Sequence, residues 1–304
     1  MRSLIRVFPM CALTLCLLYS VSVPSRAWQQ EKTRDLWDTA FDRARKQPRP
    51  ANRRTGGRRY RITTPEISPE GVNGDTVVGV TVWRLREARA RDGGERLVVH
   101  KDEGVEDWIP ERVPSNANFA EGDCVRLSIE AARAGYLYVI NREEYADGTY
   151  SEPYLIFPTR RTRGGDNQVR PGLLVDIPAQ DDRPPYLTLE RGRADQSAEV
   201  LSFIITREPL QGVQISASPQ KLSAEQVASW EKSWGGSLGR LELDGAAGQP
   251  WTRSEKEASA AVARLLSRNS PAPQTIYYNP TIKHDAPFLL AIRLGYTRPR
   301  PLSR

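Results

Sequence analysis

A succession of short β-strand patterns between Glu121 and Thr206 constrains the fold of this chain more than any other feature of its sequence. The first pattern, VRLSIE, alternates apolar and polar residues, which predicts a strand with one buried side and one solvent-facing side. The segments that follow are rich in β-branched and aromatic residues and are separated by Gly, Pro, Asp and Asn; they are GYLYVIN, PYLIFP, GLLVDIP, YLTL and EVLSFIIT. Short strands with such turns indicate an antiparallel β architecture.

Further strands are predicted on both sides of this region. The segment TVVGVTVWRLRE places Val78, Val80 and Val82 on one face of a strand and Trp83 and Leu85 on the other. LGRLEL continues as a strand, and QTIYYN and PFLLAIRLGY are predicted to close the sheets near the C-terminus.

The connections between strands have their own signals. The turn YADGTY, with Asp147 and Gly148, predicts that the chain doubles back between Asn141 and Pro153. The segment from 88 to 115 is acidic in its middle and is predicted to be a loop.

Two helices are predicted in the C-terminal third. LSAEQVASWEKSW has Ser223 and Gln226 at capping-box spacing, and a second helix from about Ser254 to Ser267 begins near a capping box of Thr252 and Glu255. We expect the second helix to pack on the sheet through Ala258, Ala261, Val262, Leu265 and Leu266. The predicted fold is therefore mainly β: an antiparallel β-sandwich-like domain with two short helices inserted near the C-terminus.

The N-terminus predicts export. Arg2 and Arg6 precede the apolar run 7–23, and a small-residue site ends at Ala27, which is the pattern of a signal peptide cleaved after that residue. A retained membrane anchor is the alternative, but polar residues leave the run shorter than a membrane span needs. Lipidation at Cys16 is a further alternative, although Leu15 occupies a position where that processing favours a small residue. We expect a periplasmic or extracellular protein with no membrane span after cleavage.

Most of the positive charge lies in one segment. Loss of three arginines with the signal peptide lowers the net charge from +7 to +4, whereas the segment 43–61 holds nine basic residues and no acidic one. Its Pro and Gly content predicts a disordered or extended arm that binds an anionic lipid or envelope polymer, or that folds back onto the acidic body as a solvated linker. Nucleic acid is an unexpected partner for an exported protein.

These patterns divide the chain into four parts. We predict a signal peptide (1–27), a short amphipathic helix (28–47), a basic disordered linker (48–71) and a β-rich domain (72–300). The helix carries Leu36, Trp37, Ala40, Phe41 and Ala44 at helical spacing, and its aspartates favour docking on protein over docking on anionic lipid.

The central region resembles the bacterial family called domain of unknown function 4384, over roughly residues 122–210. The residues that carry the resemblance are the Gly122-Asp123 pair, the GYLYV strand 135–139, the LIFP strand 155–158, the Asp166-Asn167 pair and the strand end Ile177-Pro178. The resemblance implies a small β-rich module, extracytoplasmic or appended to kinase-like or peptidase-like domains, with no established activity or catalytic residues. The helical pair and closing strands (211–297) follow it.

One catalytic pattern is present. G-x-S-x-G surrounds Ser237, and Asp244 and His284 follow in the order of an α/β-hydrolase triad. The predicted context is a helix followed by a strand, which is the reverse of a nucleophile elbow, so a helix C-cap is the favoured interpretation. His100 and His284 lack zinc spacing, and Cys124 has no neighbouring histidine in sequence. We expect no cofactor and no metal.

The loop TRRTRGGDNQVRPG is the predicted recognition surface. Arginines can grip carboxylates or phosphates bidentately, and tyrosines beside them offer amphipathic contact area. The candidate binding residues are Arg160, Arg161, Arg163, Arg170, Tyr150, Tyr154, Asp166 and Asn167. The alternative is a wide turn at Gly164 and Gly165 in which Asp166 pairs with one arginine and neighbouring tyrosines fill the core.

The sequence thus predicts a non-enzymatic binding or interaction module of the cell envelope, with another envelope protein or an anionic polymer as its partner. Two other functions stay open. One is a serine hydrolase that uses Ser237, and the other is a structural accessory protein tethered to anionic envelope polymer by the Arg-rich linker.

Overall fold

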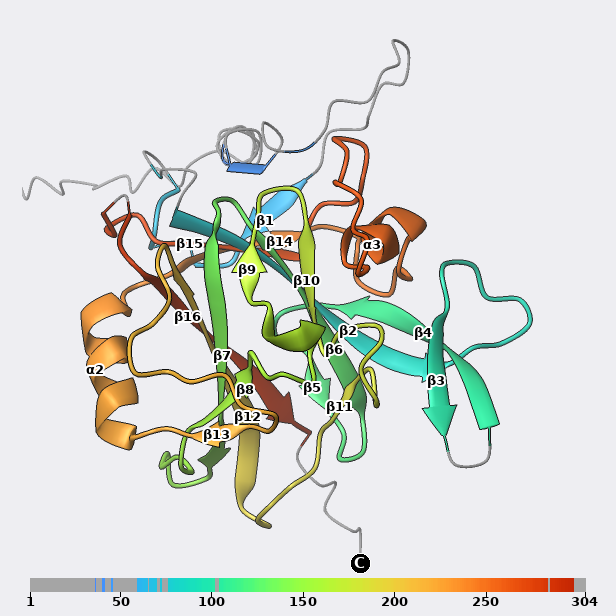
Figure 1. Cartoon of the computed structure of the whole chain (residues 1–304). Coiled ribbons are helices and arrows are strands. Elements are labelled where there is room, and N and C mark those ends of the chain that lie inside the picture. Colours follow the sequence, from blue (N-terminus) through green and yellow to red (C-terminus); the bar gives the residue numbers. More distant parts are fainter. Residues whose placement is uncertain are drawn as a thin grey trace, which may run out of the picture.

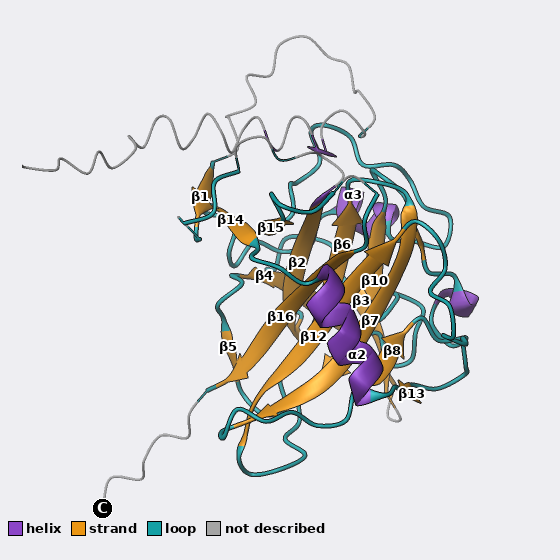
Figure 2. Cartoon of the chain, turned by 90° about the vertical axis from the view of Figure 1, so that its left-hand side faces the viewer, coloured by secondary structure: helices purple, strands orange, loops and turns teal. Residues whose placement is uncertain are grey.

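Two β-sheets face one another in the computed structural model, and a helix lies on the outer side of each (Figures 1 and 2). The structure describes residues 36, 40, 41, 45, 59–64, 66–69, 72, 76–101, 104–283 and 285–297. The predicted fold class, a mainly antiparallel β-sandwich with two helices near the C-terminus, is confirmed.

The first sheet has nine strands centred on β2 (Val77–Glu87). One edge of β2 pairs with β6 (Cys124–Ala131), and β6 pairs in turn with β10 (Leu174–Ile177) and β11 (Leu187–Thr188). The remaining strands extend from the other edge of β2; they are β15 (Thr275–Tyr278), β14 (Gly239–Leu243), β1 (Tyr60–Ile62), β4 (Gly104–Val113) and β3 (Leu97–Lys101).

The second sheet has seven strands centred on β7 (Gly135–Tyr145) and β12 (Gln196–Thr206). The other strands are β8 (Tyr154–Phe157), β13 (Gln220–Lys221), β9 (Gln168–Val169), β16 (Phe288–Tyr296) and β5 (Asn118–Phe119). The hairpin predicted at YADGTY joins β7 to β8. Among the described strands, β5 and β16 form the only parallel pair.

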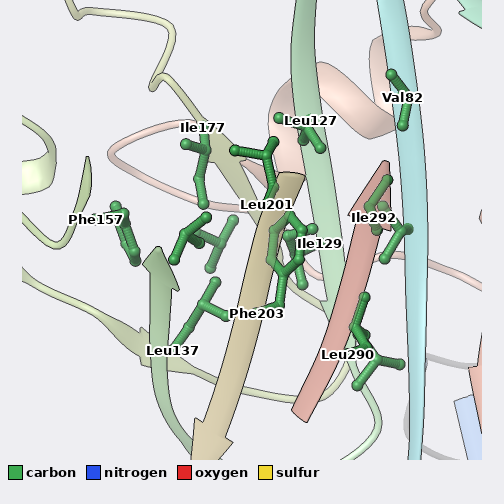
Figure 3. Packing of buried hydrophobic residues seen from close by; sticks show 14 of the residues in the cluster. Val82, Leu127, Ile129, Leu137, Phe157, Ile177, Leu201, Phe203, Leu290 and Ile292 are labelled. Atoms are coloured by element: carbon green, nitrogen blue, oxygen red, sulfur yellow. The ribbon is translucent and has the colours of Figure 1, made fainter. Parts of the chain in front are cut away.

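The main core lies between the sheets. Period-2 alternation places one face of β2 and β6 opposite one face of β7, β12 and β16, and the side chains meet there (Figure 3). The labelled members of this core are Val82, Leu127, Ile129, Leu137, Phe157, Ile177, Leu201, Phe203, Leu290 and Ile292. Each fully buried aliphatic side chain stabilises the fold by roughly 1.5–3 kcal/mol.

Helix α2 (Ala224–Trp234) covers the outer face of the seven-stranded sheet (Figure 2). Ser223 caps it by accepting a hydrogen bond from the Gln226 backbone N–H, as the sequence predicts. Val227 is buried against the sheet, while Trp230 and Trp234 stack with ring centroids 5.7 Å apart.

The outer face of β6 departs from prediction. Its polar side was expected in solvent, but Arg126, Ser128 and Glu130 are only 1%, 3% and 1% exposed. The prediction was wrong because the nine-stranded sheet is covered on this side by residues near α3 (Arg253–Ala258) and by N-terminal residues, whose polar groups take the place of water.

N-terminal residues pack on the same outer face. Leu36, Ala40 and Phe41 are buried in a cluster with residues of β1, β2, β14 and β15, as expected of a docked amphipathic segment. Arg45 belongs to the segment that we predicted either to bind an anionic polymer or to fold back onto the acidic body. It is 2% exposed and bonds Glu130 through both carboxylate oxygens, at 2.8 and 2.6 Å. Residues 46–58 of the predicted arm lie outside the described residues.

Three local predictions differ from the structure. The predicted loop 88–115 contains the β3–β4 hairpin, and β1 lies within the predicted linker 48–71. The second helix has its predicted Thr252–Glu255 capping box but ends at Ala258 instead of about Ser267. Within the part of the chain that the structure describes, no helix is both long and apolar enough to span a membrane.

Candidate functional site

The predicted recognition loop begins after β8 and folds into a tight left-handed turn. Arg163, Gly164 and Gly165 have φ angles of 51°, 63° and 89°. Asn167 then fixes the loop to β7, because its Nδ2 donates to the Leu137 carbonyl at 3.0 Å and the Leu137 N–H donates to the Asn167 carbonyl at 2.9 Å. Asn167 is 6% exposed, so its side chain holds the loop in place.

A pocket of about 450 Å³ opens beside this loop. The loop lines one wall with three of the four predicted arginines and two further polar residues: Arg161, Arg163, Arg170, Asp166 and Gln168. We call it the arginine pocket. Another part of the lining comes from the segment after α3, which contributes Ser259, Ala260, Ala261 and Ala263. The pocket thus joins a cationic wall to a wall of small apolar side chains.

The polar groups of the loop are only partly satisfied. Asp166 Oδ2 accepts from Arg163 Nη2 at 3.2 Å, and Asp166 Oδ1 accepts from the Gln168 N–H at 2.9 Å. Arg163 Nη1 is buried and has no hydrogen-bond partner among the described residues. Arg170 donates to Gln168 at 3.2 Å. The pairing of Asp166 with one arginine was the alternative interpretation of this loop, and it coexists here with the arginine pocket.

Other predicted site residues lie elsewhere. Arg160 does not line the arginine pocket, and its Nε donates to the Ile215 carbonyl at 3.2 Å. Tyr150 and Tyr154 are 49% and 43% exposed and are also outside the pocket. Tyr150 instead carries the Arg142 guanidinium over its ring at 4.7 Å. The structure therefore brings three of the four predicted arginines together at the pocket, without Arg160 and without the two tyrosines.

A buried polar network lies directly beneath the arginine pocket and was not predicted. Asp176 on β10 accepts hydrogen bonds from Arg126, Ser128 and Ser259, each at 2.6 Å. Burial lowers the pKa of Arg126, and the nearby Asp176 carboxylate opposes that shift. The sequence holds a weak signal for this network, since a charged residue interrupts the apolar strand GLLVDIP.

A second polar cluster lies at the far end of the sandwich, where the inner faces of β7 and β12 become polar. Glu143 and Glu199 are direct cross-strand partners. Burial raises the pKa of Glu199, and the neighbouring Glu143 adds to this effect. Tyr145 donates to Glu143 at 2.9 Å, and the Arg193 guanidinium covers the Tyr145 ring at 3.9 Å. The Arg193 guanidinium therefore takes the face of this ring that an external cation would otherwise contact.

The hydrolase pattern does not form a nucleophile elbow. Ser237 is exposed between the end of α2 and the start of β14, and Asp244 follows the other end of that strand. At about 3.3 Å per residue, β14 separates these two residues by on the order of 15 Å. Gly239 has a packing role, because a Cβ there would lie 1.9 Å from the Tyr278 ring. His284 lies outside the described residues.

His100 and Cys124 are the other potentially reactive side chains that the sequence singles out and the structure describes. His100 is exposed on β3, and Cys124 is half-buried, with burial raising the pKa of its thiol. Across the described ranges, no group of three or more His, Cys, Asp or Glu side chains is placed to hold a metal ion.

Comparisons with known proteins found no counterpart. A scan against protein-family models gave no match, and neither did searches of curated proteins and of solved structures. The resemblance to domain of unknown function 4384 therefore stays a prediction. The fold and the arginine pocket define the protein as a two-sheet β-sandwich with a cationic surface pocket.

Proposed function

We propose that this protein is an exported, non-enzymatic binding module of the bacterial cell envelope, and that it holds a carboxylate or phosphate group of its ligand in the arginine pocket. The observation that carries the proposal is the convergence of Arg161, Arg163 and Arg170 on one pocket. An anionic envelope polymer or an acidic segment of another envelope protein, the partner classes predicted from the sequence, can present such a group.

The charge of the lining supports an anionic ligand. The three arginines outnumber the two lining acids, Asp166 and Asp181, and Asp166 engages Arg163 through a single nitrogen. Guanidinium groups bind carboxylate and phosphate oxygens with paired, charge-assisted hydrogen bonds. The donors of the pocket therefore exceed its own acceptors, as a site for an external anion requires.

The backbone at Arg163 supports the same role. A residue with a side chain costs roughly 1–2 kcal/mol in the left-handed conformation, and glycine avoids most of this cost. Arg163 has a φ of 51° and is followed by two glycines that adopt the same conformation freely. A strained backbone that places a cationic side chain at a pocket wall is an arrangement associated with binding sites.

Calorimetric titration with phenyl phosphate tests the proposal. We expect saturable binding that Arg163→Gln weakens about tenfold or more, because a hydrogen bond to a charged group contributes about 1.5–3 kcal/mol and about 1.4 kcal/mol is tenfold in Kd. Arg160→Gln is the matched control, since it removes the same charge from the same loop but outside the pocket. The proposal fails if phenyl phosphate does not bind, or if both variants lose affinity equally.

Export rests on the pattern of residues 1–27 and has a separate check. N-terminal sequencing of the protein from its native host should begin at Trp28. A protein that retains residues 1–27 would contradict this part of the proposal without affecting the binding experiment.

A further inference from the structure

The segment after α3 exposes apolar side chains that the sequence predicts to be buried. All residues from Ala261 to Leu265 are exposed, and four of these five are apolar. Val262 is 93% exposed, the highest value among the exposed large hydrophobic side chains of the described chain, and Leu265 is 40% exposed. Contiguous exposed apolar residues on a folded protein mark contact with a partner or a membrane.

This exposed segment is anchored at both ends. At its start, just after the end of α3, Ser259 donates to buried Asp176 at 2.6 Å and accepts from Gln180 Nε2 at 2.8 Å. At its finish, the Leu266 N–H donates to the Gly172 carbonyl at 2.7 Å, and the Leu266 side chain is 1% exposed. Hydrogen bonds on both sides therefore hold the exposed apolar tip, residues 261–265, in place (Figure 1, the loop that follows α3).

The same segment forms the apolar wall of the arginine pocket. Ala261 and Ala263, which flank Val262, line the same pocket as Arg161 and Arg163. An exposed apolar tip and a cationic pocket thus share one edge of the molecule. This pairing matches the surface of an anionic bilayer, where headgroup phosphates lie next to the apolar interior.

We propose that this edge docks on a bilayer containing anionic lipid, with a headgroup phosphate in the arginine pocket and with Val262 and Leu265 in contact with the apolar boundary. The inference rests on the proposed function and specifies its ligand. Charge complementarity favours an anionic lipid surface as the occupant, because a purely apolar partner would leave the excess positive charge of the pocket without an anion.

Co-sedimentation with vesicles tests the inference, using the purified protein with vesicles of phosphatidylcholine alone or of equal parts phosphatidylcholine and phosphatidylglycerol. We expect pelleting with the mixed vesicles only. Val262→Asp should lower the association constant roughly tenfold, because it removes the burial of one valine, and Arg161→Gln should lower it about fivefold.

Val105→Asp is the matched control. Val105 is 62% exposed on β4 and does not line the arginine pocket, so this substitution adds the same charge at another exposed valine. It should leave pelleting unchanged. Every variant keeps the same basic residues 43–61, so attraction of that segment to the vesicles cancels in the comparison.

The lipid inference would be overturned if Val262→Asp and Val105→Asp lowered the association constant for mixed vesicles equally, or if neither lowered it. If phenyl phosphate binding depends on Arg163 but Val262→Asp leaves vesicle binding unchanged, the pocket binds a soluble anion and only the lipid inference fails. If neither probe depends on the pocket arginines, the proposed function fails as well.

Discussion

Replacing Arg45 should lower the free energy of unfolding more than the replacement of an exposed arginine does. Arg45 and Glu130 form a doubly hydrogen-bonded ion pair in which both side chains are 1% exposed. Arg45 also donates to the Ser270 and Pro271 carbonyls at 3.0 and 3.1 Å. Removing one partner of a buried pair leaves the other charge uncompensated, which costs about 3–5 kcal/mol.

The cost is a large part of the total stability, which for a folded protein is about 5–15 kcal/mol. We expect Arg45→Ala to shift the urea midpoint accordingly and to lower Tm by on the order of 10 °C, since each kcal/mol corresponds to about 2–4 °C in a domain of this size. Tryptophan fluorescence during urea denaturation provides the measurement, and circular dichroism provides a second probe of the same transition.

The double variant Arg45→Met with Glu130→Leu completes the test. Replacing both partners with apolar side chains removes the uncompensated charge, so the double variant should be more stable than Arg45→Ala. A loss below about 1 kcal/mol for Arg45→Ala, the range of exposed ion pairs, would show that the N-terminal segment is not docked as described.

Two further predictions concern the arginine loop and the Glu143–Glu199 cluster. The free energy of unfolding of Arg163→Gly should exceed that of Arg163→Ala by roughly 1 kcal/mol, because glycine relieves the left-handed strain while both variants lose the guanidinium. Equal urea midpoints for the two variants would contradict the strain argument. Glu199, which faces Glu143 and also contacts Gln196, has a pKa raised above its ordinary 4.5, so the folded state binds its proton more tightly than the unfolded state. Stability should therefore fall as pH rises from 4.5, and Glu199→Gln should flatten that decline in a pH series of urea titrations; an unchanged slope would contradict the shift.

Sequence patterns predicted the structure correctly where neighbouring residues along the chain decide it, as in the inward faces of strands and the first turns of helices. The inner faces of β2, β6 and β16 follow their period-2 patterns, and the capping residues Ser223 and Thr252 begin their helices as predicted. Part of the candidate site was predictable in the same way, because a Gly-Gly turn beside several arginines indicates a cationic loop by composition alone.

The rest of the site depended on contacts between distant residues. The sequence could not indicate that Arg160 bonds the Ile215 carbonyl or that Ala260 and its neighbours help to line the pocket. Helix α3 ends just before Ser259, whose hydroxyl bonds Asp176 across 83 residues, a contact that helix propensity cannot indicate.

The sequence by itself determined the strand succession, the helix starts and the presence of a basic loop, because these depend on residues within a few positions of one another. Only the tertiary structure decided what covers the second face of the nine-stranded sheet. A polar face such as Arg126, Ser128 and Glu130 is equally compatible with water and with buried ion partners, and the partners Arg45 and Asp176 lie 85 and 50 residues away. The period-2 pattern of a strand shows whether each of its faces is polar or apolar. Whether a polar face is buried depends on which distant segment of the chain packs on it.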